Sequence, residues 1–337
     1  MATIKEVANK AGVSVGTVSN VLANLPTVNS TLRKRVEKAI AQLQYRPNQV
    51  ARSLKKQTTN TLGLVISDIA NPFFPAIVRG AEDEAAASGY MLSIFNTDDQ
   101  GGKEARALDL LDGRRVDGVL LVPSLEGGTT EAVLRMLAGG TPVVTIDREI
   151  EDRAIQGYAL DAVVVDNRLG MAIGVEHLAA GGARRVAYLG GPKHMYIARE
   201  RLAGFERGLR EQKLKKEGSL LWTGDFRPET GYSVFLEKYP QTKPDALFCG
   251  NMLMCMGVLR AIEEMRLKIP QTLQIVTFDS FPILDAFRPR VSAVAQPTYE
   301  IGRAAVRTMV ERLKDRAAPS RRIVLDPDWK PGETTFA

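Results

Sequence analysis

The chain has 337 residues, of which 45% are hydrophobic and 25% are charged, so it can form two or three globular domains. No apolar run is long enough for a membrane span, and no basic stretch followed by an apolar one indicates a secretory signal. Cys249 and Cys255, with His177 and His194, fit no metal or redox motif. We therefore expect a protein of the reducing cytoplasm that needs no metal and no cofactor.

The formal net charge of +6 is concentrated at one end of the chain. Residues 1–60 contain ten lysines and arginines against Glu6 and Glu37, a net charge of +8, which leaves −2 for residues 61–337. A basic module beside a nearly neutral body is typical of a domain that binds nucleic-acid phosphates. A merely solvated basic tail is the alternative, but such a tail would lack apolar periodicity.

Three short amphipathic helices are predicted within residues 1–46. Thr3 is a favourable N-cap for the first helix, and Gly12 is a favourable residue to end it. Ser14 caps the second helix, and Asn29 or Ser30 caps the third. Their apolar faces comprise Ile4, Val7, Ala8 and Ala11, then Val18, Val21 and Leu22, then Val36, Ile40 and Leu43. The tight turn between the first two helices predicts a helix-turn-helix, whose second helix can enter the major groove of DNA.

The start of the second helix carries the candidate base-reading residues. Because its apolar residues must turn inward, the residues left facing outward are Val15, Gly16, Ser19 and Asn20. Val15 can touch a thymine methyl group, Gly16 allows close approach of the backbone, and Asn20 can form two hydrogen bonds with adenine. The alternative is that Val15 and Gly16 are simply tolerated surface residues.

Residues 3–22, TIKEVANKAGVSVGTVSNVL, and 28–56, VNSTLRKRVEKAIAQLQYRPNQVARSLKK, closely resemble the DNA-binding headpiece of the lac and purine repressor family. The resemblance implies that Val15, Gly16 and Asn20 read bases. It also implies residues at or near phosphate-facing positions, namely Thr3, Ser14, Thr17 and Ser19. Where the family usually has asparagine this chain has Ala23, so a backbone contact is lost there or is supplied by Asn24.

Residues 47–54, PNQVARSL, resemble the hinge helix of the same family. Asn48 can cap this helix, and Ala51 and Leu54 lie on one face, but the helix is too short to be stable alone in water. The resemblance implies that it folds on DNA beside its mate in a dimer and inserts Leu54 into the minor groove at a central CG step, with Arg52 also at the DNA. An ordinary linker helix is the alternative.

Residues 61–337 alternate strand-like and helical segments, which predicts an α/β body with parallel sheets. The body resembles a periplasmic sugar-binding protein with two lobes around a cleft, as in this family. The resemblance implies that the chain crosses between lobes near residues 160–163, 290–293 and 319–323. The expected parts are a headpiece at 1–46, a hinge and linker at 47–60, an N-terminal lobe at 61–160 with 293–320, and a C-terminal lobe at 162–290 with 322–337.

Polar residues that follow the predicted strands are expected to line the cleft, because open α/β sheets bind ligands beyond the carboxyl ends of their strands. This rule selects Asp68, Asn71, Ser124, Asp147, Arg148, Asn251 and Asp279, with the aromatic neighbours Phe73, Phe74 and Phe226. Carboxylates and amides bind hydroxyls while ring faces pack on C–H surfaces, so the set indicates a carbohydrate-like ligand. The family resemblance adds Arg201 and Gln296.

Simpler roles remain open for part of this set. They are turn formation for Asp68, Asn71 and Asp279, a helix-surface position for Arg201, and a core position for Phe73 or Phe74. The family usually has a further carboxylate where this chain has Met252 and Ser280. Since Arg148 and Arg201 are kept, and an arginine fork matches a carboxylate or a phosphate, a sugar acid or a phosphorylated ligand gains weight.

No catalytic motif is present: the sequence has no dinucleotide or phosphate-binding glycine loop and no nucleophile elbow, so we do not expect an enzyme. We predict a ligand-responsive, DNA-binding transcription regulator, usually a repressor in this family, that binds a near-palindromic operator as a homodimer. The effector, a sugar, a sugar acid or a related compound, could induce or co-repress. The chain ends without the added helix of the family's tetramers, which favours a dimer. The alternative is a plain small-molecule binding protein or a sugar-modifying enzyme.

Overall fold

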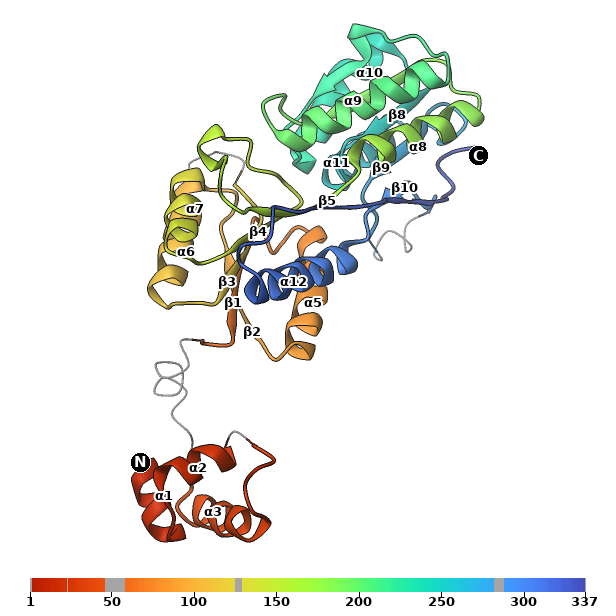
Figure 1. The fold of residues 1–337 in the computed structure, drawn as a ribbon. Coiled ribbons are helices and arrows are strands. Elements are labelled where there is room, and N and C mark those ends of the chain that lie inside the picture. The colour runs from red at the N-terminus through yellow and green to blue at the C-terminus, as the bar shows by residue number, and fades with distance from the viewer. Residues whose placement is uncertain (1, 23, 46–57, 125–128, 282–287, 337) are drawn as a thin grey trace. The chain divides into compact units, whose positions relative to one another are not determined.

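The computed structural model describes residues 2–22, 24–45, 58–124, 129–281 and 288–336. The chain divides into two compact units, residues 1–59 and 60–337 (Figure 1). The predicted hinge residues Asn48, Ala51, Arg52 and Leu54, and the departure at Ala23, lie outside the described residues. Among the helices that are described, none is long and apolar enough to cross a bilayer.

The N-terminal unit contains three helices, α1 (Ile4–Ala11), α2 (Val15–Leu22) and α3 (Ser30–Gln42). A capping box starts α1, because the Thr3 hydroxyl accepts from the Glu6 backbone N–H and the Glu6 carboxylate accepts from the Thr3 N–H. Gly12 ends this helix with φ 62°, a left-handed conformation that favours glycine. The helices share one small core, formed by Val7, Ala8, Ala11, Val18, Val21, Val36 and Ala39.

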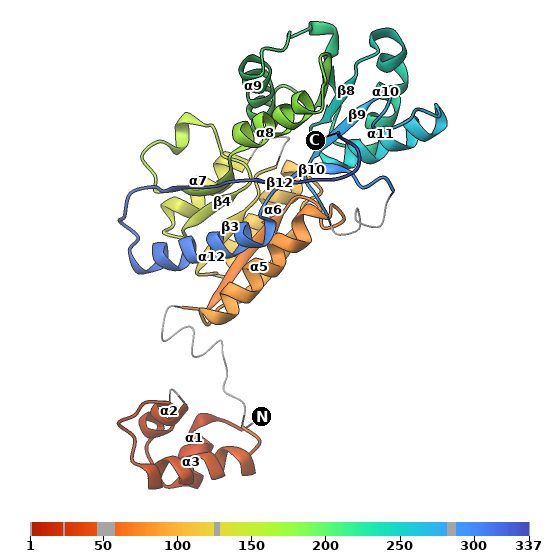
Figure 2. The ribbon, with the colours of Figure 1, turned by 90° about the vertical axis from the view of Figure 1, so that its right-hand side faces the viewer.

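The body is built on two six-stranded sheets with helices on both faces of each (Figures 1 and 2). The first sheet has the order β11-β5-β4-β3-β1-β2 and is parallel throughout. Its strands are β1 (Thr61–Ile66), β2 (Met91–Asn96), β3 (Gly118–Leu121), β4 (Val143–Ile146), β5 (Asp161–Val165) and β11 (Arg322–Leu325). On one face lie α5 (Phe73–Ala87) and α12 (Thr298–Lys314), and on the other lie α6 (Gly101–Gly113) and α7 (Thr129–Ala138).

The second sheet has the order β12-β10-β9-β8-β6-β7, and its strands are parallel except at the β10–β12 edge. Its strands are β6 (Val186–Gly190), β7 (Leu221–Thr223), β8 (Ala246–Cys249), β9 (Gln274–Phe278), β10 (Ser292–Ala295) and β12 (Asp328–Lys330). Helices α8 (Asn167–Ala180) and α9 (Tyr196–Glu211) cover one face, and α10 (Pro228–Thr242) and α11 (Met252–Glu264) cover the other. Two short 3-10 helices are Arg153–Ile155 and Gly218–Leu220.

The strand pairing places each crossing between lobes later than the predicted boundary. Strand β5 pairs with β4 and β11 in the first sheet, β10 pairs with β9 in the second, and β11 belongs to the first. The chain therefore changes lobes after residues 165, 295 and 325, so the predicted boundaries at 160/162, 290/293 and 320/322 are corrected. The physical reason is that β5, β10 and β11 each form backbone hydrogen bonds with a neighbouring strand of the sheet that the chain is about to leave.

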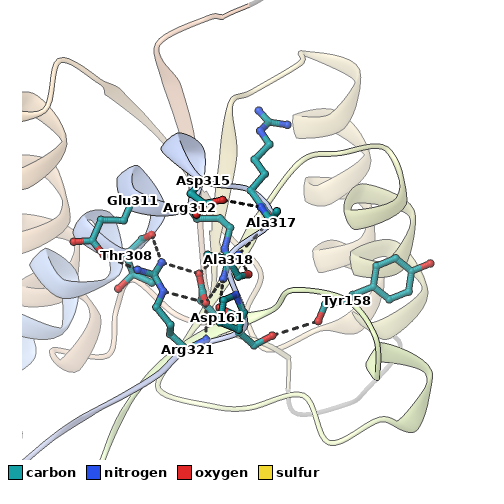
Figure 3. A network of polar contacts seen from close by, with 12 residues as sticks. Tyr158, Asp161, Thr308, Glu311, Arg312, Asp315, Ala317, Ala318 and Arg321 are labelled. Carbon is teal, nitrogen blue, oxygen red and sulfur yellow. Dashed lines mark hydrogen bonds and ion pairs between the residues drawn. The ribbon is translucent and has the colours of Figure 1, made fainter.

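A buried ion-pair network ties α12 to β5 and β11 (Figure 3). Asp161 is fully buried and accepts two hydrogen bonds from Arg312, at 2.7 and 2.9 Å, and one from the Arg321 backbone N–H at 2.8 Å. Arg312 also donates to the carbonyl oxygens of Ala318 and Pro319. The network therefore fixes the segment that links α12 to β11.

Candidate functional site

In the N-terminal unit, the start of α2 is the exposed candidate site. Val18 and Val21 are buried, whereas the Val15 side chain is 41% exposed and Gly16 and Asn20 are exposed as well. A Cβ placed on Gly16 would meet only the Ser14 hydroxyl, at 3.6 Å, so the backbone here is open to a close partner. The arrangement offers an exposed helix N-terminus, which is the part of a recognition helix that contacts base edges.

Several residues with predicted phosphate contacts already make local hydrogen bonds. The Ser14 hydroxyl accepts from the Thr17 N–H at 3.1 Å and lies 3.0 Å from the Thr17 hydroxyl. Arg33 donates to the Asn24 side-chain oxygen at 2.6 Å and to the Leu25 carbonyl oxygen at 2.8 Å, so the Asn24 NH₂ group, the part that can donate to a phosphate, is not used by this bond. These bonds orient the turn on either side of α2.

In the body, a cavity of about 550 Å³ is lined by residues at the carboxyl ends of strands from both sheets. Of the twelve side chains predicted for the ligand, eleven line it: Asp68, Asn71, Phe73, Phe74, Asp147, Arg148, Arg201, Phe226, Asn251, Asp279 and Gln296. Ser124 does not line the cavity; its hydroxyl donates to the Asp99 carbonyl oxygen at 2.6 Å and so supports the cavity wall.

Arg148 is buried in the first-lobe wall and is held by an acidic partner. Its Nη1 donates to the Asp99 carboxylate at 2.6 Å and to the Pro123 carbonyl oxygen at 2.9 Å. Its Nε lies 3.5 Å from the Asp147 carboxylate. Burial raises the pKa of Asp147, against the lowering influence of Arg148 and Arg201. The charge of Arg148 is therefore largely balanced before any ligand arrives.

Arg201 is also buried, so the helix-surface alternative is wrong. Its Nε donates to the Asn167 side-chain oxygen at 2.8 Å and its Nη1 to the Gly250 carbonyl oxygen at 2.5 Å. The guanidinium stacks on the Phe278 ring with its carbon 3.9 Å from the centroid. Its Nη2 makes no hydrogen bond to any residue that the structure describes, so this NH₂ group can donate to a ligand.

Asp279 and Gln296 form a buried pair in the same wall. The Gln296 amide NH₂ donates to one Asp279 carboxylate oxygen at 2.5 Å, while the Gln296 amide oxygen is buried with no partner among the described residues. Burial raises the pKa of Asp279, although Arg201 and the hydrogen bond from Gln296 act in the opposite direction. The pair thus presents hydrogen-bond acceptors, which a ligand hydroxyl would satisfy.

Other lining residues also shape the backbone, and for Asp68 and Asn71 this role is the turn formation of the simpler interpretation. Asp68 and Asn71 each accept from the N–H two residues later, at 2.9 and 3.1 Å, and so form turns. Asn251 caps α11 by accepting from the Met254 N–H and donates to the Phe226 carbonyl oxygen at 3.0 Å. These three residues have fewer free polar atoms for a ligand than their side chains suggest.

The two adjacent phenylalanines at the start of α5 share one environment. Phe73 and Phe74 are both buried and pack edge to face with centroids 5.1 Å apart, and both also border the cavity. Each of the two rings therefore contributes both to the core and to the cavity wall, rather than one ring to each.

Sequence reasoning missed several lining residues, among them Asp98, Asp99, Asp225, Arg227 and Glu229. Asp98 and Asp99 follow β2, so the rule of strand ends would have selected them had it been applied to that strand. Both have positive φ, at 52° and 57°, which aspartate tolerates better than most residues.

Comparisons with known proteins agree with this architecture. Residues 3–48 match the family described as bacterial regulatory proteins, lacI family, and residues 175–335 match a periplasmic binding protein-like domain. The ribose operon repressor of Halalkalibacterium halodurans is 32% identical over 338 residues, covering 99% of this chain and 97% of the relative. The chain belongs to the lacI family. The fold class and the interpretation as a DNA-binding transcription regulator rather than an enzyme are thereby confirmed.

Solved structures of lacI family regulators show the same fold. A complex of the transcriptional regulator CelR with cellobiose is 28% identical with a TM-score of 0.73, and the match covers 99% of this chain and 100% of that one. The Lac repressor dimer bound to operator and the anti-inducer ONPF is 24% identical with a TM-score of 0.86, with 100% and 99% covered. The names of these relatives differ in the sugar they mention, so the effector must be argued from this cavity itself.

Proposed function

We propose that this lacI family regulator binds a near-palindromic operator as a dimer and that a small, uncharged, polyhydroxylated effector occupies the cavity. The observation that carries the proposal is that one chain contains both an exposed start of helix α2 and, in its body, a cavity lined by buried hydrogen-bond acceptors. A plain binding protein or a sugar-modifying enzyme would have no use for the basic N-terminal unit. Since its target is chromosomal DNA, we also place the protein in the cytoplasm.

The DNA contacts follow from the side chains on the exposed face of α2. Val15 and Gly16 would approach base edges, Asn20 would read adenine, and the backbone and hydroxyl groups of Thr3 and Ser14 would lie near phosphates. Ten lysines and arginines in residues 1–60 supply the attraction to the DNA backbone, so affinity falls as salt rises.

Replacing Asn20 by alanine is expected to remove the preference at one base pair of each half-site, a loss of about 1–3 kcal/mol of discrimination. Operators selected from random DNA by the wild type and the variant would be compared position by position. Asn9→Ala, at an exposed asparagine of α1, is the matched control and should keep the wild-type preference. An unchanged preference in Asn20→Ala would remove this residue from base reading.

The charge balance of the cavity argues against an anionic effector. Its described lining residues include seven carboxylates but only three arginines, and Arg148 is already paired with Asp99 and Asp147. A sugar acid or a sugar phosphate brings acceptors, which would face acceptors already there. A hydroxyl can donate to the Gln296 amide oxygen or to Asp279 and accept from Arg201. These contacts support a neutral ligand over the sugar acid or phosphorylated ligand that Arg148 and Arg201 suggested from the sequence.

Thermal melting of the full chain should identify the effector class. A panel of candidate effectors would be tested. Each carbon skeleton in this panel would be offered as the neutral sugar or polyol, as the corresponding acid and as the phosphate. A ligand at 100 times its dissociation constant adds about 2.7 kcal/mol of stability. We expect neutral compounds to raise the melting temperature and their anionic forms to do so much less, with inorganic phosphate as the control for ions on the basic unit. Stronger stabilisation by the anionic forms would contradict this assignment.

The regulatory step would be linkage between the cavity and the operator. An effector that closes the lobes changes how the two first lobes of a dimer meet, and this change is passed to residues 47–54. A coupling free energy of about 1–3 kcal/mol would alter operator affinity about 5–150-fold. Induction and co-repression remain equally compatible, and operator binding with and without the identified compound decides between them.

A further inference from the structure

Two polar ties join the lobes at the rim of the cavity without lining it. In the first, the Glu149 carboxylate accepts from the Tyr196 hydroxyl at 2.9 Å and from Arg322 Nε at 2.7 Å. Arg322 Nη2 also donates to the Tyr196 oxygen at 3.3 Å. In the second, Arg199 forms an ion pair with Glu151. Glu149, Glu151 and Arg322 belong to the first lobe, whereas Tyr196 and Arg199 start α9 in the second.

These residues alternate along the chain with residues that face the ligand space. Asp147 and Arg148 line the cavity and Glu149 follows them directly. Met195 and Ile197 line it from the other lobe, and Tyr196 lies between them. Apart from Arg322 on β11, the contacts that join the lobes here therefore lie on the same two short segments, 147–151 and 195–199, as surfaces that would meet an effector.

From this arrangement we infer that the two ties form a latch, comprising Glu149, Glu151, Tyr196, Arg199 and Arg322, that adds to the free energy with which the lobes close, whether or not an effector is bound. Any movement that separates the lobes at this rim must break both ties, because each joins the two lobes. The latch residues are positioning residues: they set how much of the population is closed and do not contact the ligand.

The Tyr196 donor of the latch keeps its proton across the physiological range. Burial raises the pKa of Tyr196 to about 12, with the hydrogen bond from Arg322 acting in the lowering direction, so the phenol remains a donor. The arginines stay charged at any such pH. Loss of the Tyr196 proton therefore does not release the first tie, so this donor biases closure constantly.

A constant bias has a defined effect on ligand binding. If only the closed form binds tightly, the apparent dissociation constant equals the intrinsic one divided by the closed fraction. Weakening the latch should then lower the affinity for the effector without changing any residue of the cavity wall. This consequence rests on the proposed function, whereas closure itself can be measured without an effector.

The test combines Tyr196→Phe with Arg199→Gln, which removes one donor from each tie. Distances between spin labels at Asp112→Cys on α6 and Glu263→Cys on α11 would report closure, because both positions are exposed and the native Cys249 and Cys255 are fully buried. Labelled chains would be diluted with unlabelled ones so that only distances within a chain are seen. We expect a second, longer distance and a closed-to-open ratio about tenfold lower than in the wild type.

The matched control combines Tyr232→Phe with Arg207→Gln. Tyr232 donates to Glu264 at 2.6 Å and Arg207 pairs with Glu211, so the same chemistry is removed inside one lobe. This control should keep the wild-type distances, and a distribution in the latch variant that equals that of the control overturns the inference. A shifted distribution in a protein that responds to no compound of the panel would leave the latch standing and refute the effector proposal instead.

Discussion

Replacing Asp161 by alanine is expected to lower the free energy of unfolding of the body by about 3–5 kcal/mol, because it leaves the buried Arg312 cation without a compensating charge. The Arg312 side chain is 2% exposed, and Asp161 is its only carboxylate partner in the described parts of the chain. Arg321 is more exposed and keeps a bond to Glu311. Once Asp161 is removed, Arg312 retains only carbonyl oxygens, which do not neutralise its charge (Figure 3).

Urea unfolding of the full chain, followed by the fluorescence of its two tryptophans, would measure this loss. Asp109→Ala is the matched control, since it breaks an ion pair with Arg135 in which both side chains are more than half exposed. Such exposed pairs contribute at most about 1 kcal/mol. Equal effects of the two substitutions would show that the Asp161 network does not anchor the segment between α12 and β11.

The same network gives a pH dependence with a defined sign. Burial alone would raise the pKa of Asp161, but the hydrogen bonds from Arg312 and Arg321 outweigh it and the pKa is lowered. A carboxylate with a lowered pKa stabilises the folded state above its unfolded pKa, about 3.9, and this contribution disappears as the pH falls through its folded pKa. The difference in stability between the wild type and Asp161→Ala should therefore shrink below about pH 4.

The features that the sequence predicted well are those with a local cause. The burial of Val18 and Val21 follows from helical spacing, and because these residues face inward, Val15 and Gly16 are exposed. Asp147 and Asp279 reach the cavity because a strand ends just before each of them. Periodicity and the rule of strand ends need no knowledge of distant residues, so one sequence is enough to apply them.

The features that were missed depend on which distant residues meet. Arg148 lines the cavity as expected, but its partner Asp99, 49 residues away, which occupies its Nη1, was not predicted. Arg201 lines the cavity, as the family resemblance implied, but helical spacing could not show that Asn167, the Gly250 carbonyl oxygen and Phe278 together solvate its charge in the interior. The crossings between lobes were displaced because the pairing of β5 with β11 joins residues about 160 positions apart. Local spacing contains no information about such partners.

Replacing Asp279 by asparagine is expected to weaken effector binding about 10–100-fold while leaving operator affinity unchanged, because a charged acceptor contributes about 1.5–3 kcal/mol to a hydrogen bond. Asparagine keeps the shape of the side chain and tolerates the positive φ of 77° at this position, so the fold should persist. Its amide oxygen can still accept from Gln296, but the charge opposite Arg201 is lost.

Isothermal titration with the compound found in the melting panel would give the effector affinity, and fluorescence anisotropy with the selected operator would give the DNA affinity. Asp245→Asn, at a second-lobe aspartate that accepts from the Arg184 and Arg185 backbone outside the cavity, is the matched control and should bind the effector normally. If Asp279→Asn kept full effector affinity, the ligand would bind elsewhere, and the acceptor pair of Asp279 and Gln296 would have a structural role alone. Loss of both affinities would instead mean that this buried carboxylate stabilises the body as a whole.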